Sequence, residues 1–211
     1  MKLSSCIAVV AVASLTFGAT CPTATAAVIY DNIGNGGNGF FVSSPDKWLA
    51  QRFNSDATNL KLSDVTLRLA APTTPGNFSL SLYSDVANHP GSSVSTLFSG
   101  TTTAAGVGSG SNVLFGGLTQ AMSPNTNYWL VLSSAPGDLT AFGWEATSNP
   151  SGSGSGFQTA SASSSNQGLS WGALSAPAKT RIIATVPEPS SMALVLFGIA
   201  GFLARGRFSR H

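Results

Sequence analysis

The tryptophans carry the most evident binding chemistry in this sequence. The flat face of an indole ring can stack on a sugar ring, although core packing is the commoner fate of tryptophan in a small β domain. Trp144 and Trp171 flank a Gly/Ser-rich run. Tyr128 directly precedes Trp129, and neighbouring residues of a strand point to opposite faces, so the two cannot enter the same core. We predict that sugar contacts come from whichever of Tyr128, Trp144 and Trp171 lie exposed.

Residues that catalyse hydrolysis are sparse. His89 is the only histidine between residues 27 and 186, and it precedes Pro90-Gly91, a turn signal. No Gly-x-Ser-x-Gly motif accompanies it, and a zinc ion bound there would need carboxylates for its remaining ligands. Asp138 and Glu145 could form the carboxylate pair of a glycoside hydrolase, but solvated acids in loops are the simpler interpretation. We therefore expect no enzymatic activity.

A calcium site is a more plausible alternative than catalysis. Asp31, Asn32 and Asp46 offer the hard oxygen ligands that calcium prefers, although no complete ligand-spacing motif is present. Residues 34–39 match Gly-x-Gly-x-x-Gly, but a dinucleotide site needs that motif between a strand and a helix. The residues that follow do not start a helix, so we predict a flexible loop there and no cofactor.

The distribution of charge argues against a nucleic-acid partner. Residues 27–186 contain six basic and seven acidic residues, which leaves a formal charge of −1. The net charge of +2 for the whole chain therefore arises at its ends. The charged residues there are Lys2, Glu188, Arg205, Arg207 and Arg210. A body that binds nucleic acid would need a basic patch, and this composition does not provide one.

The first 26 residues have the pattern of a secretory signal peptide. Lys2 supplies a positive charge, and the uncharged, largely apolar residues 7–19 are fewer than the ~20 of a spanning helix. Ala24-Thr25-Ala26 fits the small-x-small cleavage pattern. Both cysteines, Cys6 and Cys21, fall inside this segment, so we expect a mature chain without disulfides. Lipidation of Cys21 is a minor alternative, because a threonine stands where a small Ala or Gly is expected before it.

The C-terminal residues have the pattern of a sorting tail. Val186-Pro187-Glu188-Pro189 must stay extended, because proline cannot enter a helix interior. Residues 192–204 are apolar and predict a short membrane helix, about 20 Å long at ~1.5 Å per residue. The basic cluster of Arg205, Arg207 and Arg210 would hold the C-terminus on the cytoplasmic side of the inner membrane.

This order of parts resembles the PEP-CTERM sorting signal of Gram-negative bacteria, which is also labelled the ice-binding protein C-terminal domain. The resemblance implies processing by an exosortase near Pro187-Glu188-Pro189, in a host that makes exopolysaccharide. It also implies transient anchoring in the inner membrane, followed by residence at the cell surface or in the extracellular matrix. The alternative label does not imply that the body binds ice, since Thr101-Thr102-Thr103 is a single run and not an array.

Between the signal peptide (residues 1–26) and the sorting tail (residues 187–211), the body predicts an all-β fold. Short apolar alternations separated by Gly, Pro, Asn and Ser clusters favour a single jelly-roll-like β-sandwich over residues 27–186, with about eight to ten strands. Residues 127–132 are apolar on both faces, which predicts a central strand. The Gly/Ser/Thr-rich residues 101–111 and 151–156 predict long surface loops or flexible excursions.

Two apolar patterns predict which side chains of a strand point into the core. Phe78, Leu80 and Leu82 alternate with polar residues or tyrosine, which predicts one buried face. Along residues 60–69 the apolar phase changes at Ser63-Asp64, which predicts a β-bulge.

The body as a whole resembles the R type of choice-of-anchor domains in exported PEP-CTERM proteins. The matching segments are residues 48–53, 78–83, 89–91 and 127–132. That family implies a location and a β-rich fold but no settled activity. We therefore predict a non-enzymatic cell-envelope or extracellular-matrix protein. A carbohydrate-binding module of the exopolysaccharide matrix is the first alternative, and a hydrolase is the second.

Overall fold

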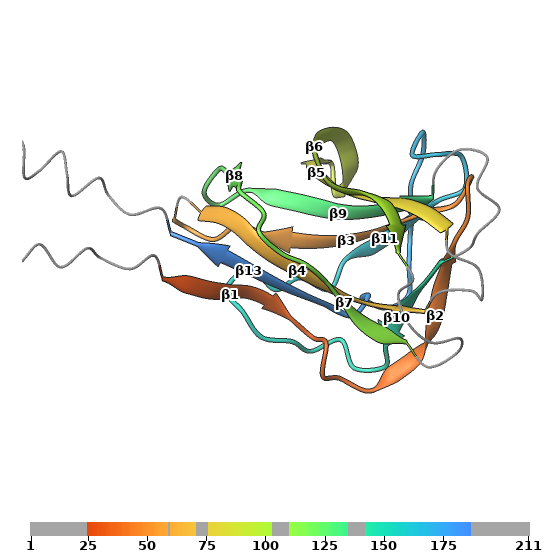
Figure 1. Cartoon of the computed structure of the whole chain (residues 1–211), viewed down its shortest axis with the longest axis horizontal. Coiled ribbons are helices and arrows are strands. Elements are labelled where there is room, and N and C mark those ends of the chain that lie inside the picture. The colour runs from red at the N-terminus through yellow and green to blue at the C-terminus, as the bar shows by residue number, and fades with distance from the viewer. Residues whose placement is uncertain (1–24, 59, 71–75, 103–109, 135–141, 187–211) are drawn as a thin grey trace, which may run out of the picture. The chain divides into compact units, whose positions relative to one another are not determined.

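The computed structural model describes residues 25–58, 60–70, 76–102, 110–134 and 142–186. The strands of this part form two antiparallel sheets (Figure 1). The predicted all-β body is confirmed, whereas its jelly-roll connectivity stays a prediction. The predicted tail helix and residues 1–24 of the predicted signal peptide lie outside the described residues, whereas Ala26, the last residue predicted for that peptide, already belongs to a strand. The described part contains no helix that is long and apolar enough to cross a membrane.

The first sheet is built around the long strand β4. Its strands in spatial order are β1 (Ala26–Asp31), β13 (Thr180–Thr185), β4 (Leu60–Ala70), β10 (Phe142–Thr147) and β2 (Gly37–Ser43). Two short strands also pair with β4, namely β7 (Ser111–Phe115) and β8 (Gln120–Met122).

The second sheet has β9 at its centre. Its strands in spatial order are β12 (Gly172–Ala173), β11 (Ser161–Ser164), β3 (Trp48–Asn54), β9 (Asn127–Ser134), β5 (Gly76–Val86) and β6 (His89–Thr102). The apolar run of residues 127–132 therefore forms a central strand, as predicted, flanked by β3 and β5.

The main hydrophobic core lies between the two sheets and contains buried side chains from both. From β5 it receives Phe78, Leu80 and Leu82, so the predicted alternation is confirmed. Burial of this apolar surface supplies most of the driving force for folding.

The predicted β-bulge in β4 is confirmed. Ile183 of β13 pairs with Asp64. The next residue, Ala184, pairs with Leu62, which leaves Ser63 without a pairing partner. The Ser63 hydroxyl donates to the Ile183 carbonyl (3.1 Å). Because one residue is inserted, the apolar positions on both sides of the bulge face the same core.

The hairpin between β5 and β6 turns earlier than predicted. Val86 pairs with His89, so Ala87 and Asn88 form the turn. Both have positive φ, 50° and 65°, which matches a two-residue hairpin turn whose twist suits the flanking strands. The prediction that Pro90-Gly91 makes this turn is wrong, because these residues already belong to β6.

Residues 151–156, predicted as a surface loop or a flexible excursion, run along β1 and are hydrogen-bonded to its backbone. Ser153 exchanges two backbone hydrogen bonds with Asp31, each 2.8 Å long. The N–H of Asn54 in β3 donates to the Gly156 carbonyl (2.9 Å). A Cβ atom at Gly156 would overlap the Asn54 carbonyl oxygen. The glycine here therefore permits close backbone approach. The segment is a mostly exposed surface loop, in agreement with one of the two predicted alternatives, and backbone hydrogen bonds attach it to β1 and β3.

The predicted loop at residues 34–39 is also corrected in part. Gly37 and the two residues after it begin β2, and Gly37 pairs with Thr147 of β10. A Cβ atom at Gly37 would overlap the carboxylate of Glu145. Of the other predicted loop, residues 101–111, the stretch 103–109 lies outside the described residues.

Candidate functional site

Two of the three aromatic residues predicted to contact sugar are buried. Trp144 of β10 is 0% exposed, and its Nε1 donates to the Lys179 carbonyl (3.0 Å). Tyr128 of β9 is 7% exposed, and its hydroxyl accepts a hydrogen bond from the Ser123 N–H (3.0 Å). Both rings belong to the main core, so neither offers a free face. The prediction was limited to exposed rings, so burial excludes these two residues, whereas Trp171 keeps a partly exposed side chain and stays a candidate.

The three residues predicted as a calcium alternative are engaged with other groups. Asp31 Oδ2 accepts a hydrogen bond from Arg181 Nε (2.7 Å). Asn32 is 2% exposed, and its Oδ1 accepts a backbone N–H of β13 (2.7 Å). Asp46 Oδ1 accepts a hydrogen bond from Gln167 (2.9 Å). Over the described residues, no group of three or more His, Cys, Asp or Glu is placed to hold a metal ion.

Of the residues considered for hydrolysis, the structure describes His89 and Glu145, which lie in different sheets. His89 is exposed at the start of β6, in the second sheet. Glu145 is buried in β10, in the first sheet. Its suggested partner, Asp138, lies outside the described residues.

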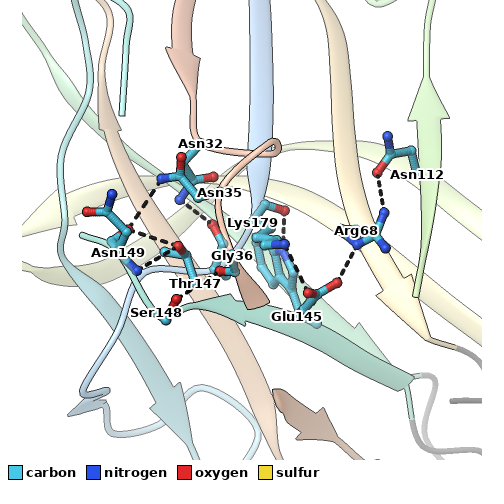
Figure 2. A network of polar contacts seen from close by, with 12 residues as sticks. Asn32, Asn35, Gly36, Arg68, Asn112, Glu145, Thr147, Ser148, Asn149 and Lys179 are labelled. Atoms are coloured by element: carbon cyan, nitrogen blue, oxygen red, sulfur yellow. Dashed lines mark hydrogen bonds and ion pairs between the residues drawn. The ribbon is translucent and has the colours of Figure 1, made fainter. Parts of the chain in front are cut away.

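Glu145 instead lies at the centre of an ion cluster that the sequence does not predict (Figure 2). Its Oε1 lies 2.9 Å from Lys179 Nζ, and its Oε2 pairs with Arg68 Nε. The side chains of Glu145 and Lys179 are 11% and 6% exposed. Arg68 also reaches the Asn112 side chain (3.5 Å).

This ion cluster joins three parts of the first sheet. Arg68 lies on β4, Glu145 on β10, and Lys179 directly precedes β13. The Lys179 N–H also donates to the Glu145 carbonyl (2.7 Å). Because each carboxylate oxygen of Glu145 already faces a cation, the residue acts as a buried counter-charge that positions the strands.

A different cluster lies on the outer face of the second sheet, opposite to the main core. Alternate residues of β3 and β9 point to this face and form a small apolar layer there. Its buried members are Ala50, Trp129, Val131 and Ala162, and packed beside them are Trp48, Tyr83, Ala160 and Trp171. Together with Arg52, we call these residues the outer aromatic patch.

Strand register sets the floor of the outer aromatic patch. Arg52, Trp129 and Tyr83 stand in one row across β3, β9 and β5. The neighbouring row contains the small residues Ala50 and Val131, each 1% exposed. Because these side chains are short, the longer aromatic side chains around them cover the sheet at this point.

Asp85 of β5 holds the buried part of the patch in place. Its Oδ1 accepts a hydrogen bond from Trp129 Nε1 (2.7 Å), and its Oδ2 pairs with Arg52 Nη2 (3.0 Å). The guanidinium carbon of Arg52 lies 5.9 Å from the centre of the Trp129 ring, within the range of a cation–π contact. The two charges of the patch are therefore paired with each other.

Trp48, Tyr83 and Trp171 form the partly exposed rim of the patch. Trp171 follows a loop, residues 165–170, that passes beside Trp48. Gly168 in this loop has φ +85°, and a Cβ atom there would lie 2.8 Å from Cζ3 of Trp48. Glycine is therefore needed both for the backbone conformation and for the close approach to the ring.

The patch also contains hydrogen-bond donors without a partner. Within the described residues, the buried side-chain nitrogen or oxygen atoms lacking a hydrogen bond are Trp48 Nε1, Arg52 Nε and Trp171 Nε1. All three belong to the outer aromatic patch. Leaving a buried donor unsatisfied costs about 1–3 kcal/mol, so such groups are rare in folded proteins and need an explanation.

The sequence signal that points to this patch is the same one that predicts the central strand. Residues 127–132 are apolar on both faces, and Trp48 and Ala50 alternate with apolar residues of β3. In a protein of two sheets, only one face of each strand meets the shared core. Apolar residues on the other face therefore indicate a second covered surface.

Comparisons with known proteins concern the tail and not the body. A family model described as the PEP-CTERM protein-sorting motif matches residues 185–207. The match includes the predicted Val186-Pro187-Glu188-Pro189 together with Arg205 and Arg207, whereas Arg210 lies beyond it. No curated protein matches the chain. The choice-of-anchor resemblance of the body and the ice-binding label stay predictions.

This motif is a substrate signal for exosortase, and it implies export and transient membrane anchoring before processing. The body described above therefore belongs to a chain that carries a PEP-CTERM sorting motif at its C-terminus.

Proposed function

We propose that this protein is a non-enzymatic component of the cell envelope or extracellular matrix, presented outside the cell as a folded β-sandwich. The observation that carries the proposal is the position of the sorting motif. The matched residues begin at Thr185, the last residue of β13, so the tail follows the folded body without a spacer. Exosortase processing would then release or transfer the complete sandwich.

The arrangement of charged side chains supports a role without catalysis. Three acids of the body hold cations in ion pairs. These pairs are Asp31 with Arg181, Asp85 with Arg52, and Glu145 with Arg68 and Lys179. An acid that serves as a structural counter-charge is poorly suited to exchange protons with a substrate.

The test replaces Pro187, Glu188 and Pro189 by alanine in the host and follows the protein by cell fractionation and mass spectrometry. We expect the wild-type protein outside the inner membrane without peptides from the apolar tail, and the variant retained in the inner membrane with its tail intact. Ser209→Ala with His211→Ala, beyond the matched residues, is the matched control. Extracellular wild-type protein that still carries Arg205 to His211 would contradict the proposal.

A second candidate function is binding of carbohydrate, the first alternative from the sequence. It is favoured by the outer aromatic patch, which combines partly exposed rings with unpaired N–H donors. The two candidates are compatible, because a matrix protein can be retained by the polysaccharide around it.

A further inference from the structure

We propose that the outer aromatic patch is a binding site for a neutral polysaccharide. In this site the rings of Trp48, Tyr83 and Trp171 stack on sugar rings, and the unpaired N–H groups donate to sugar oxygens. The inference deepens the second candidate function and does not depend on sorting by the tail.

The chemistry of the patch matches the two surfaces of a pyranose ring. A pyranose presents C–H groups on its flat faces and oxygen atoms around its edge. The rim of the patch presents three partly exposed aromatic rings, from Trp48, Tyr83 and Trp171, which pack against C–H groups. The unpaired N–H groups lie in the same patch and require oxygen acceptors.

The charges of the patch favour a neutral ligand. Arg52 and Asp85 form an ion pair 3.0 Å long, so the patch carries no net charge. Around the aromatic residues, the same outward face of β5 and β9 continues with the hydroxyl groups of Ser79 and Ser133. The two charges of the patch are already paired with each other, so a uronic-acid polymer would gain no ion pair from Arg52 without breaking this pair, which disfavours it.

The loop that leads to Trp171 supplies the movement that binding requires. The three unpaired nitrogen atoms are shielded from solvent in the described structure, so a ligand oxygen reaches them only when a covering ring shifts. Residues 165–170 are mostly exposed, and Leu169 is 87% exposed. For the loop to move, it must break hydrogen bonds such as those from the Gln167 N–H to the Asp46 carbonyl (3.2 Å) and from the Gly168 N–H to the Ser164 hydroxyl (2.8 Å), which ligand contacts then offset.

The test is affinity electrophoresis of the full chain, purified in a zwitterionic detergent without a sugar headgroup. Hydroxyethyl cellulose, laminarin and galactomannan are the neutral probes, each cast in a separate gel, and alginate is the anionic probe. We expect at least one neutral probe to retard the protein and alginate to have little effect. Trp171→Ala and Tyr83→Ala should each weaken that retardation about tenfold, the loss expected when a stacking ring is removed.

Matched variants separate stacking from general damage. Tyr83→Phe keeps the ring and should retain most of the binding. Leu114→Ala, at a 64% exposed position in the first sheet, and Leu169→Ala, in the loop itself, should bind as the wild type does. If Trp171→Ala loses the near-ultraviolet circular dichroism of the folded body, this variant is damaged in its packing. The binding of Trp171→Phe and Tyr83→Ala then tests whether the rings stack on sugar.

Several results would overturn the inference. They are retardation by none of the neutral probes, equal retardation of the wild type and both alanine variants, or stronger retardation by alginate. Self-association in sedimentation that disappears in Trp171→Ala would assign the patch to a second copy of the chain. Sorting does not enter this assay, so a failed sorting test would leave its result unaffected.

Discussion

At the scale of single residues, the body contains ion pairs of two kinds. The Glu145 cluster is buried, with Lys179 only 6% exposed at its side chain. The pair between Arg181 and Asp31 is open to water, since the Arg181 side chain is 46% exposed. Exposed pairs contribute little because water and salt screen them, whereas a buried charge that loses its partner is costly.

We therefore expect Glu145→Gln to lower the free energy of unfolding by about 3 kcal/mol, because it leaves Lys179 buried without a counter-charge. Arg181→Gln, which breaks the exposed pair, should cost no more than about 1 kcal/mol. Urea titrations followed by tryptophan fluorescence measure both, since all four tryptophans lie in the body. Equal losses in the two variants would show that the Glu145 cluster does not hold the sheet together.

Tyr30 makes the stability of the folded body depend on pH in the alkaline range. It is 0% exposed, its hydroxyl accepts a hydrogen bond from Asn32 (3.2 Å), and burial raises its pKa well above the ordinary value. The folded state therefore favours the neutral phenol. Its contribution is complete below about pH 10, the pKa of an unfolded tyrosine, and is lost as pH rises further.

Tyr30→Phe should accordingly flatten the fall in unfolding free energy above about pH 10. Tyr83→Phe is the comparison: desolvation raises the pKa of Tyr83 too, but this side chain is partly exposed, so its effect should be smaller. Urea titrations between pH 9 and 11 on the full chain measure both slopes. An unchanged slope in Tyr30→Phe would show that this phenol ionises as readily in the folded state as in the unfolded one.

At the scale of elements, patterns in the sequence correctly predicted those features of the strands that depend only on residues close together in the chain. The alternation at Phe78, the central strand at residues 127–132 and the bulge at Ser63 are all local, and all are present. The ion cluster could not be predicted in this way, because Glu145 meets an arginine 77 positions away in the chain. Which of the three candidate rings lie exposed could not be predicted for a related reason, since exposure depends on how the sheets are assembled, and two of the three are buried.

The Gly-rich segments show that composition alone does not distinguish a freely exposed loop from one held by close backbone contacts. We expect Gly156→Ala to destabilise the body by about 1–3 kcal/mol, the usual cost of overpacking, because its Cβ would overlap the Asn54 carbonyl. Gly34→Ala should be nearly neutral, because nothing lies within 4 Å of a Cβ there. Thermal unfolding of the two variants distinguishes a close backbone contact from a flexible loop, for which both substitutions would be harmless.

At the scale of the whole molecule, the body is held by its core and its two sheets. The only cysteines are Cys6 and Cys21, both outside residues 27–186. We expect dithiothreitol and a chelator to leave the Tm of the full chain unchanged within about 1 °C, because a body of this size buries enough apolar surface to be stable alone. A fall in Tm of several degrees with chelator would instead support a calcium site that includes Asp31 and Asp46.

The pairing of the first and last strands has a consequence for the timing of export. Ala27, the first residue of the predicted mature chain, pairs with Ala184 near the end of β13, and β13 lies between β1 and β4. A chain that crosses a membrane from its N-terminus delivers β13 last, so the first sheet lacks an interior strand until translocation is nearly complete. The sorting motif begins at Thr185, the residue after Ala184. Because the motif implies transient membrane anchoring, we expect the first sheet to be completed only when the tail reaches the membrane, while the chain is still tethered there.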